Sequence, residues 1–176
     1  IPLAGKTILS IIIDQLLDAG IQEYILITGY LGDKIQDYVK KEYPQIKVHF
    51  ITQNERKGLG HAIYLTKEVV ADDELFIVLG DTICEYDVKD FLSQQGSVLG
   101  VKKVDDPRSF GVAEIDDHGL ITKVVEKPQI PKSNMALVGL YKISDSGNLF
   151  NCLSNLIHKD DHDQEETNLT DALECM

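Results

Sequence analysis

The chain of 176 residues has 43% hydrophobic and 26% charged residues, which suits one domain with a sizeable core. Its formal net charge of −12 argues against a nucleic-acid-binding surface, which needs clustered lysine and arginine, so any phosphate ligand must be met by a few local cations or by a metal. No apolar run approaches the ~18 residues of a membrane-spanning helix, and no signal peptide is visible.

The first half of the chain predicts alternating helices and strands. Helices are expected over residues 7–19, 33–41, 60–70 and 87–94, and strands over 24–28, 48–51, 74–79 and 98–104. In the first helix Ile8, Ile12 and Leu16 recur at helical spacing, and Gly20 ends it. Asp33 is expected to cap the second helix. This alternation predicts an α/β fold with a Rossmann-like mixed, mainly parallel sheet and helices on both faces.

The second half predicts a different pattern. Residues 112–115 and 120–126 are expected to form a β-hairpin insertion around the glycine-containing turn 116–119. A strand over 135–143 and a helix over 148–159 follow, and the acidic tract 160–166 is expected to be a solvated loop. No internal repeat or linker divides the chain.

The three cysteines lie far apart in the sequence and form no CxxC motif. We expect Cys84, Cys152 and Cys175 to be thiols in a reducing compartment, in agreement with a cytoplasmic location.

Two predicted strands deliver polar side chains at their C-terminal ends, where open α/β sheets bind ligands. Asp81 follows the apolar segment 75–79 and Gly80, and its carboxylate would suit Mg²⁺, although an aspartate there also caps turns. Glu126 and Lys127 end the second strand and offer a hydroxyl acceptor beside a cation. Together these groups would suit a phosphorylated sugar.

The geometry of the second strand end leaves alternatives. Neighbours on a strand point to opposite faces, so Glu126 and Lys127 can reach one pocket only if the chain twists at Pro128. Gly111 either permits a β-bulge or offers bare backbone to a sugar ring.

The polar loop from Gln53 leads into a predicted helix. Gln53 offers a donor and an acceptor, as reading a pyrimidine edge requires. Gly58 and Gly60 would let a base or phosphate approach backbone N–H groups, but glycine-rich loops before helices are common. His61 is expected to be a surface residue of the helix.

Seven motifs occur in an order and spacing that resemble one family. They are Gly29-Tyr30, Gln53 followed by Gly58-Leu59-Gly60-His61-Ala62, Leu79-Gly80-Asp81, Ser109-Phe110-Gly111-Val112, Val125-Glu126-Lys127-Pro128, Ala136 through Tyr141, and Glu166 followed by Leu169-Thr170-Asp171-Ala172. Over its full length the chain resembles sugar-phosphate nucleotidyltransferases, in particular glucose-1-phosphate thymidylyltransferase and UTP-glucose-1-phosphate uridylyltransferase.

The resemblance implies the nucleotide-diphospho-sugar transferase fold and its reaction. A nucleotidyl group would pass from dTTP or UTP to a sugar 1-phosphate, such as glucose 1-phosphate, giving a nucleotide-sugar and pyrophosphate with Mg²⁺ as cofactor. The residues that match the family's site are Gln53 and Gly58 for the base, Asp81 for the metal, Gly111, Glu126 and Val138 for the sugar, and Lys127 for the sugar phosphate. Tyr141 shares a strand with Val138 and would lie behind the site.

The resemblance also implies that parts of the family's domain lie outside residues 1–176. The triphosphate-binding loop and a central strand would precede residue 1, and a second metal-binding aspartate would follow Met176. We therefore expect a nucleotidyltransferase domain truncated at both ends, lacking its N-terminal strand and inactive alone. The missing strand would lie between the strands 24–28 and 74–79, which would then not pair with each other.

Two other classes share parts of this pattern. A non-catalytic module of the same fold would bind nucleotide-sugars for regulation or assembly and could lose the metal site, whereas Asp81 is present. A flavodoxin-like or glycosyltransferase domain needs a phosphate loop or an Asp-x-Asp pair at a strand end, and Asp81-Thr82-Ile83 supplies no such pair. The base, the sugar and the presence of a homo-oligomer stay open.

Overall fold

The structure is a computed structural model, which describes residues 2–3, 5–163 and 166–176. The helices are α1 (Ile8–Asp18), α2 (Gly32–Glu42), α3 (Gly58–Tyr64), α4 (Lys67–Val70), α5 (Val88–Ser93), α6 (Ser146–Asp163) and α7 (Leu169–Cys175). The strands are β1 (Pro2–Leu3), β2 (Lys6–Thr7), β3 (Glu23–Thr28), β4 (Lys47–Thr52), β5 (Leu75–Val78), β6 (Val98–Lys103), β7 (Gly111–Ile115), β8 (Ile121–Glu126) and β9 (Met135–Ile143).

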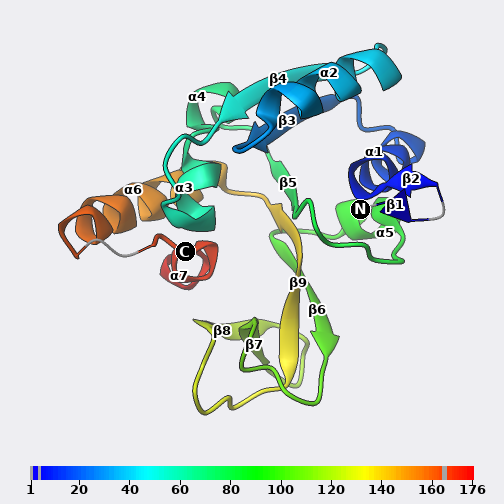
Figure 1. The fold of residues 1–176 in the computed structure, drawn as a ribbon. Helices are drawn as coiled ribbons and strands as arrows, with labels where there is room; N and C mark the ends of the chain where they lie inside the picture. The colour runs from blue at the N-terminus through cyan, green and yellow to red at the C-terminus, as the bar shows by residue number, and fades with distance from the viewer. Residues whose placement is uncertain (1, 4, 164–165) are drawn as a thin grey trace.

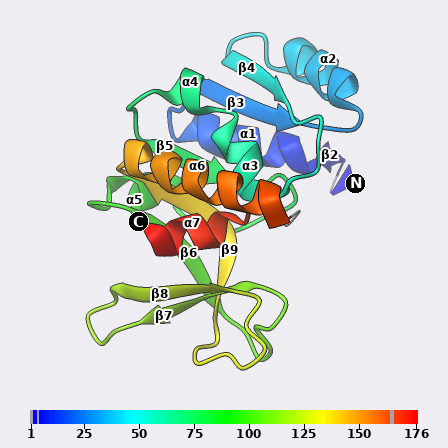
Figure 2. The same cartoon turned by 90° about the vertical axis from the view of Figure 1, so that its left-hand side faces the viewer.

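The strands form mixed sheets, as predicted, but among the described strands the pairing is mainly antiparallel rather than mainly parallel. β3 and β4 pair in parallel, whereas the larger sheet, in the order β5-β9-β7-β8, is antiparallel. Its centre is the nine-residue β9, which pairs with β6 along one edge and with β5 and then β7 along the other. The predicted hairpin is confirmed as β7 and β8, which Figure 2 shows at the end of β9 far from β5.

Helices cover both faces of β5. Successive side chains of a strand point to opposite faces, so both faces of β5 carry apolar side chains that helices can cover. On β5, Leu75 and Ile77 contact the core that includes residues of α3, α6 and α7, while Phe76 and Val78 contact the core of α1, α2 and α5. Figure 1 shows α1 and α5 on one side of β5 and α3, α6 and α7 on the other. The predicted two-faced helical covering is confirmed.

A wide gap separates β3 from β5. Within the residues that the structure describes, β3 pairs only with β4, and β5 pairs only with β9. A cavity of about 860 Å³ is lined by both strands. The prediction that these strands are not paired neighbours is confirmed, and what fills the space between them stays a prediction.

Some helix boundaries differ from the predicted ones. The cap of α2 is Leu31, which has a φ of 64°, and Asp33 lies in the first turn of the helix without capping it. The single helix predicted over 60–70 is two helices, α3 and α4. The Thr66 hydroxyl donates to the Ile63 carbonyl at 2.7 Å, a local bond that competes with a continuous helix.

The helix α6 is longer at both ends than predicted. It begins at Ser146, where the Asp145 carboxylate accepts a hydrogen bond from the Asn148 backbone N–H at 2.9 Å. It continues through Asp163, so the acidic tract predicted as a loop starts inside a helix. Residues 164–165 of that tract lie outside the described residues. None of the described helices is long and apolar enough to cross a bilayer.

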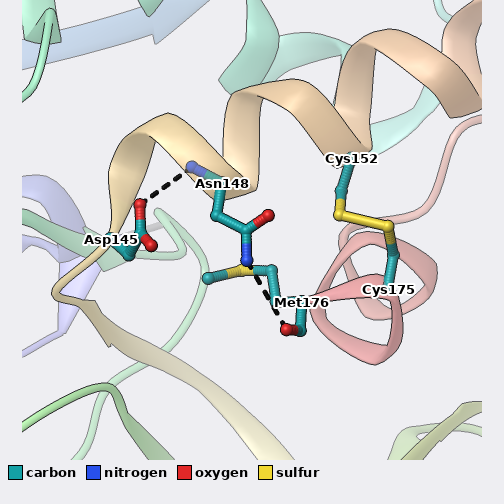
Figure 3. Close-up of a disulfide and its surroundings, with 5 residues drawn as sticks. All are labelled: Asp145, Asn148, Cys152, Cys175 and Met176. Carbon is teal, nitrogen blue, oxygen red and sulfur yellow. Dashed lines mark hydrogen bonds between the residues drawn. A yellow bond between two sulfur atoms is a disulfide. The ribbon is translucent and has the colours of Figure 1, made fainter.

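The prediction of three free thiols is wrong for two of them. Cys152 of α6 and Cys175 of α7 form a disulfide with their Cα atoms 5.9 Å apart, and Cys84 is free. Figure 3 shows the bridge beside a second tie between the same elements, in which the Asn148 amide donates to the Met176 carbonyl at 3.5 Å. The separation of 23 positions in the sequence concealed this proximity, because only the packing of the two helices creates it.

Candidate functional site

The hairpin places Gly111 and Glu126 directly opposite each other. A Cβ atom on Gly111 would lie 2.9 Å from Leu137 Cδ1, 3.1 Å from Thr170 Oγ1 and 3.3 Å from Glu126 Oε2. The irregularity in the pairing of β7 with β8 lies at Glu114 and Ile115, so Gly111 is not a bulge. Glycine is needed here because α7 and the Glu126 carboxylate approach the strand closely.

The Glu126 carboxylate is held from two sides. Its Oε2 accepts a hydrogen bond from the Thr170 hydroxyl at 2.7 Å, and its Oε1 lies 3.4 Å from Lys127 Nζ. Its side chain is 23% exposed, so one part of the carboxylate remains open to a ligand. Sequence reasoning assigned Thr170 no role, although it lies in a motif of the resemblance. Its position on α7 fixes the orientation of Glu126.

Lys127 turns the chain at the end of β8. Its φ is 38°, and its backbone N–H donates to the Phe110 carbonyl at 3.1 Å. The twist that the sequence required is therefore present, and the ammonium group lies on the same side as the Glu126 carboxylate. The Lys127 side chain is 63% exposed, which leaves most of its surface free to meet a ligand.

Asp81 lies one residue beyond Gly80 at the end of β5. The segment is fixed to β9 because the Leu79 N–H donates to the Gly139 carbonyl at 3.0 Å. A Cβ atom on Gly80 would meet nothing within 4 Å, so the approach to this strand end is open.

The Asp81 carboxylate is exposed and accepts a hydrogen bond from the Thr82 hydroxyl at 3.3 Å. A single free carboxylate fits Mg²⁺, which takes oxygen ligands and commonly combines one or two carboxylates with substrate phosphates. Among the described residues, no group of three or more histidine, cysteine, aspartate or glutamate side chains is placed to hold a metal. Further ligands to a metal at Asp81 would have to come from a substrate or from residues outside this set.

Val138 and Tyr141 belong to β9. The Cγ2 atom of Val138 lies 3.1 Å from where a Cβ on Gly100 would be, so it packs against β6. Tyr141 is buried in the core. Burial, and secondarily the charge of Glu126, raises the pKa of Tyr141 to about 12. Tyr141 shares β9 with Val138, and its role behind the site stays a prediction.

The Gln53 side chain is already hydrogen-bonded. Its Nε2 donates to the Gly58 carbonyl and lies against His61 Nδ1, both at 3.0 Å. To read a base with its N–H groups, Gln53 would have to exchange these partners. His61, expected on the helix surface, is half-buried in this contact.

The loop glycines are required by chain packing. Gly58 has a φ of 87°, and a Cβ on it would lie 2.4 Å from the Thr167 carbonyl oxygen. The Gly60 N–H donates to the same oxygen at 2.8 Å. The expected open approach of a ligand to Gly60 is therefore wrong, because the segment before α7 occupies that place.

Apart from Val138, which packs against β6, the predicted site residues lie in three local groups. Gly111, Glu126 and Lys127 meet at the end of β8, and Gln53 contacts Gly58 at the start of α3. Asp81 follows β5, and Gly80 beside it lines the same cavity as Gln53.

Comparison with known proteins identifies the family. The profile described as nucleotidyl transferase matches residues 1–176. The chain belongs to the nucleotidyl transferase family. The family predicted from the seven motifs is confirmed.

The relatives of this nucleotidyl transferase chain include sugar-nucleotide enzymes. It is 39% identical over 174 residues to the bifunctional protein GlmU of Methanocaldococcus jannaschii, covering 98% of the chain and 40% of that protein. It is 34% identical over 144 residues to the UTP–glucose-1-phosphate uridylyltransferase AglF of Haloferax volcanii, covering 78% of the chain and 59% of that protein. The chain thus spans about half the length of these relatives.

A solved structure has the same fold. The crystal structure of a UDP-glucose pyrophosphorylase complexed with UDP-glucose superposes with a TM-score of 0.84 at 21% identity, covering 99% of this chain and 76% of that one. At this identity the likeness establishes the fold alone, and it confirms the predicted Rossmann-like architecture.

Proposed function

We propose that the full-length protein transfers a nucleotidyl group from dTTP or UTP to a sugar 1-phosphate, with glucose 1-phosphate as the expected sugar. The products would be a nucleotide-sugar and pyrophosphate. The observation that carries this proposal is the convergence of the Glu126 carboxylate and the Lys127 ammonium group beside Gly111, at the end of β8. The uridylyltransferase AglF among the relatives supports the same reaction class.

The pair at the end of β8 suits the two ends of a sugar phosphate. Glu126 has its Oε2 bound to Thr170, and its Oε1 can accept a hydrogen bond from a sugar hydroxyl. Lys127 can hold the phosphate, whose oxygen attacks the α-phosphorus of the nucleotide in line while pyrophosphate leaves. Positioning and charge neutralisation supply most of the catalysis in reactions of this type.

We propose that Asp81 holds the Mg²⁺ ion, which would neutralise phosphate charge during the transfer. The exposed carboxylate and the open space at Gly80 support this assignment. Gln53 would read the base through its carbonyl oxygen, or through its amide after release from Gly58 and His61.

We also propose that residues 1–176 form part of a longer nucleotidyltransferase domain in the cytoplasm and are inactive alone. Two observations on the described residues support inactivity of the isolated segment: β3 and β5 each have an edge with no strand partner, and Asp81 belongs to no group of three or more possible metal ligands. The Cys152–Cys175 disulfide is unusual for that compartment, where thiols are kept reduced.

The reaction itself tests the proposal. The full-length protein, incubated with Mg²⁺, glucose 1-phosphate and either UTP or dTTP, should release pyrophosphate and form the matching nucleotide-sugar, identified by mass spectrometry. ATP should be a poor substrate if Gln53 reads a pyrimidine. Tight binding of a nucleotide-sugar without pyrophosphate release from any pyrimidine nucleotide would favour the non-catalytic module instead.

A further inference from the structure

A second cavity, of about 340 Å³, adjoins Lys127 on the side of the loop between β6 and β7. It is lined by Asp106, Arg108, Ser109, Lys127, Pro128 and Gln129. Its volume is at the lower end of that of small-molecule sites. The sequence motifs included Ser109 and Lys127, but Asp106 and Arg108 had no assigned role.

Arg108 lies at the wall of this cavity, where its exposed side chain pairs with Asp106. Its Nε donates to Asp106 Oδ1 at 2.9 Å and its Nη2 donates to Oδ2 at 2.7 Å, a bidentate pair. The Arg108 backbone N–H also donates to Oδ1, at 3.2 Å. Side-chain hydrogen bonds from Arg108, supported by that backbone bond, lower the pKa of Asp106 to about 2, so its carboxylate is ionised at neutral pH.

The cavity offers more donors than acceptors. A guanidinium group has five N–H bonds, and the pair with Asp106 uses two of them, which leaves three for a ligand. Lys127 and the side chains of Ser109 and Gln129 add further donors. Both oxygens of Asp106, the one carboxylate in the lining, already accept hydrogen bonds. Such a surface suits a ligand group rich in acceptor oxygens.

We propose that Arg108 is a second cation of the sugar-phosphate site, which binds the phosphate of the sugar 1-phosphate together with Lys127, while Asp106 fixes the guanidinium. This inference rests on the proposed function. A phosphate carries several acceptor oxygens and negative charge, and a fixed guanidinium matches it in geometry. The cavity adjoins Lys127 beside Glu126, and neither Gln53 nor Asp81 lines it, so we assign it to the sugar phosphate rather than to the nucleotide.

Steady-state kinetics of the full-length protein test the assignment. Arg108→Gln should raise the KM for glucose 1-phosphate about tenfold or more, as expected for a lost charge-assisted hydrogen bond, while the KM for the nucleotide stays within twofold. Arg108→Lys keeps the positive charge but loses the forked guanidinium group. Its KM for glucose 1-phosphate should lie between those of the wild type and Arg108→Gln. Asp106→Asn keeps Arg108 but loosens it, and should also give an intermediate KM.

Direct binding separates this inference from the proposed function. Calorimetry with inorganic phosphate and with glucose 1-phosphate should show about tenfold weaker binding to Arg108→Gln even if the wild type has no turnover. Lys103→Gln, which removes one exposed positive charge outside the cavity, should bind both ligands as the wild type does. Unchanged binding and KM in Arg108→Gln would overturn the inference, and so would a rise confined to the nucleotide KM.

Discussion

Asp81 is suited to a test by substitution, because its carboxylate is exposed and contributes little to packing. Asp81→Asn should reduce Mg²⁺-dependent turnover of the full-length enzyme by orders of magnitude, since an amide carries no charge for the metal. The free energy of unfolding should change by less than ~0.5 kcal/mol, as is usual for surface substitutions. Asp117→Asn, in the exposed hairpin turn, is the matched control. Near wild-type turnover in Asp81→Asn would remove Asp81 from the site.

Gly58 tests whether the loop glycines serve chain packing. Gly58→Ala adds a Cβ that would lie 2.4 Å from the Thr167 carbonyl oxygen, at a residue with a φ of 87°. We expect a loss of ~1–3 kcal/mol or more in the free energy of unfolding, measured by urea denaturation. Gly80→Ala is the control, because its Cβ would meet nothing within 4 Å. Equal stability of the two variants would contradict the packing role.

The helix α7 connects the core to the hairpin of β7 and β8. Thr170 donates to Glu126, and Glu174 Oε2 accepts a hydrogen bond from the Val124 N–H on β8 at 2.7 Å. The other side of α7 is joined to α6 by the disulfide, as Figure 3 shows. The position of the Glu126 carboxylate therefore depends on how firmly α7 is held.

The disulfide should contribute to stability by restricting the unfolded chain. For cysteines 23 residues apart, the loop-entropy estimate is ~3 kcal/mol. Reduction with dithiothreitol should lower the unfolding free energy of the wild type by about this amount. Cys175→Ser should be destabilised to a similar extent and insensitive to the reductant, whereas Cys84→Ser should behave as the wild type does. An unchanged wild type after reduction would show that the bridge does not form in solution.

Most elements could be predicted, because hydrophobic periodicity and turn residues are local signals. The strand β9 was predicted with its observed bounds, and Thr7, at the start of the first predicted helix, caps α1 through a hydrogen bond from the Ser10 N–H to its hydroxyl. The break between α3 and α4 was missed, because it is associated with the hydrogen bond from the Thr66 hydroxyl to the Ile63 carbonyl, which hydrophobic periodicity does not show. The disulfide was missed because it depends on the packing of two helices.

The chemistry of the candidate site was easier to predict than its contacts. Strand ends and residue types predicted Asp81, Glu126 and Lys127 as site residues, and their roles stay predictions. Thr170 contacts Glu126, and Arg108 lines the same cavity as Lys127. Both arrangements arise from the fold, and no spacing in the sequence shows them. Gln53 illustrates the opposite case, since its residue type suggested a free base-reading amide that the structure shows to be hydrogen-bonded.

Across the whole molecule, two cores meet the sheets from opposite faces, and buried tyrosines in both should respond to alkaline pH. Burial is the main cause that raises the pKa values of Tyr24, Tyr43 and Tyr141 to about 12 each. A raised pKa in the folded state gives stability that is fully present below pH ~10, the value for an unfolded tyrosine, and is lost as the pH rises towards 12.

The free energy of unfolding should therefore fall steeply between about pH 10 and 12, as followed by urea denaturation. Tyr141→Phe should flatten this decline, since it removes one buried phenol, and Tyr30→Phe should not, since Tyr30 is 86% exposed. A constant unfolding free energy over this range would mean that the three phenols are not buried in solution.

The end of β8 is proposed to hold the phosphate of a sugar 1-phosphate, and the kinetics of Lys127→Ala in the full-length protein measure that role. Removing one charge-assisted hydrogen bond typically costs ~1.5–3 kcal/mol, or roughly ten- to hundredfold in affinity. We predict that the KM for glucose 1-phosphate rises by this factor while the KM for UTP or dTTP changes little. Equal increases for both substrates, or no increase for either, would show that Lys127 does not hold this phosphate.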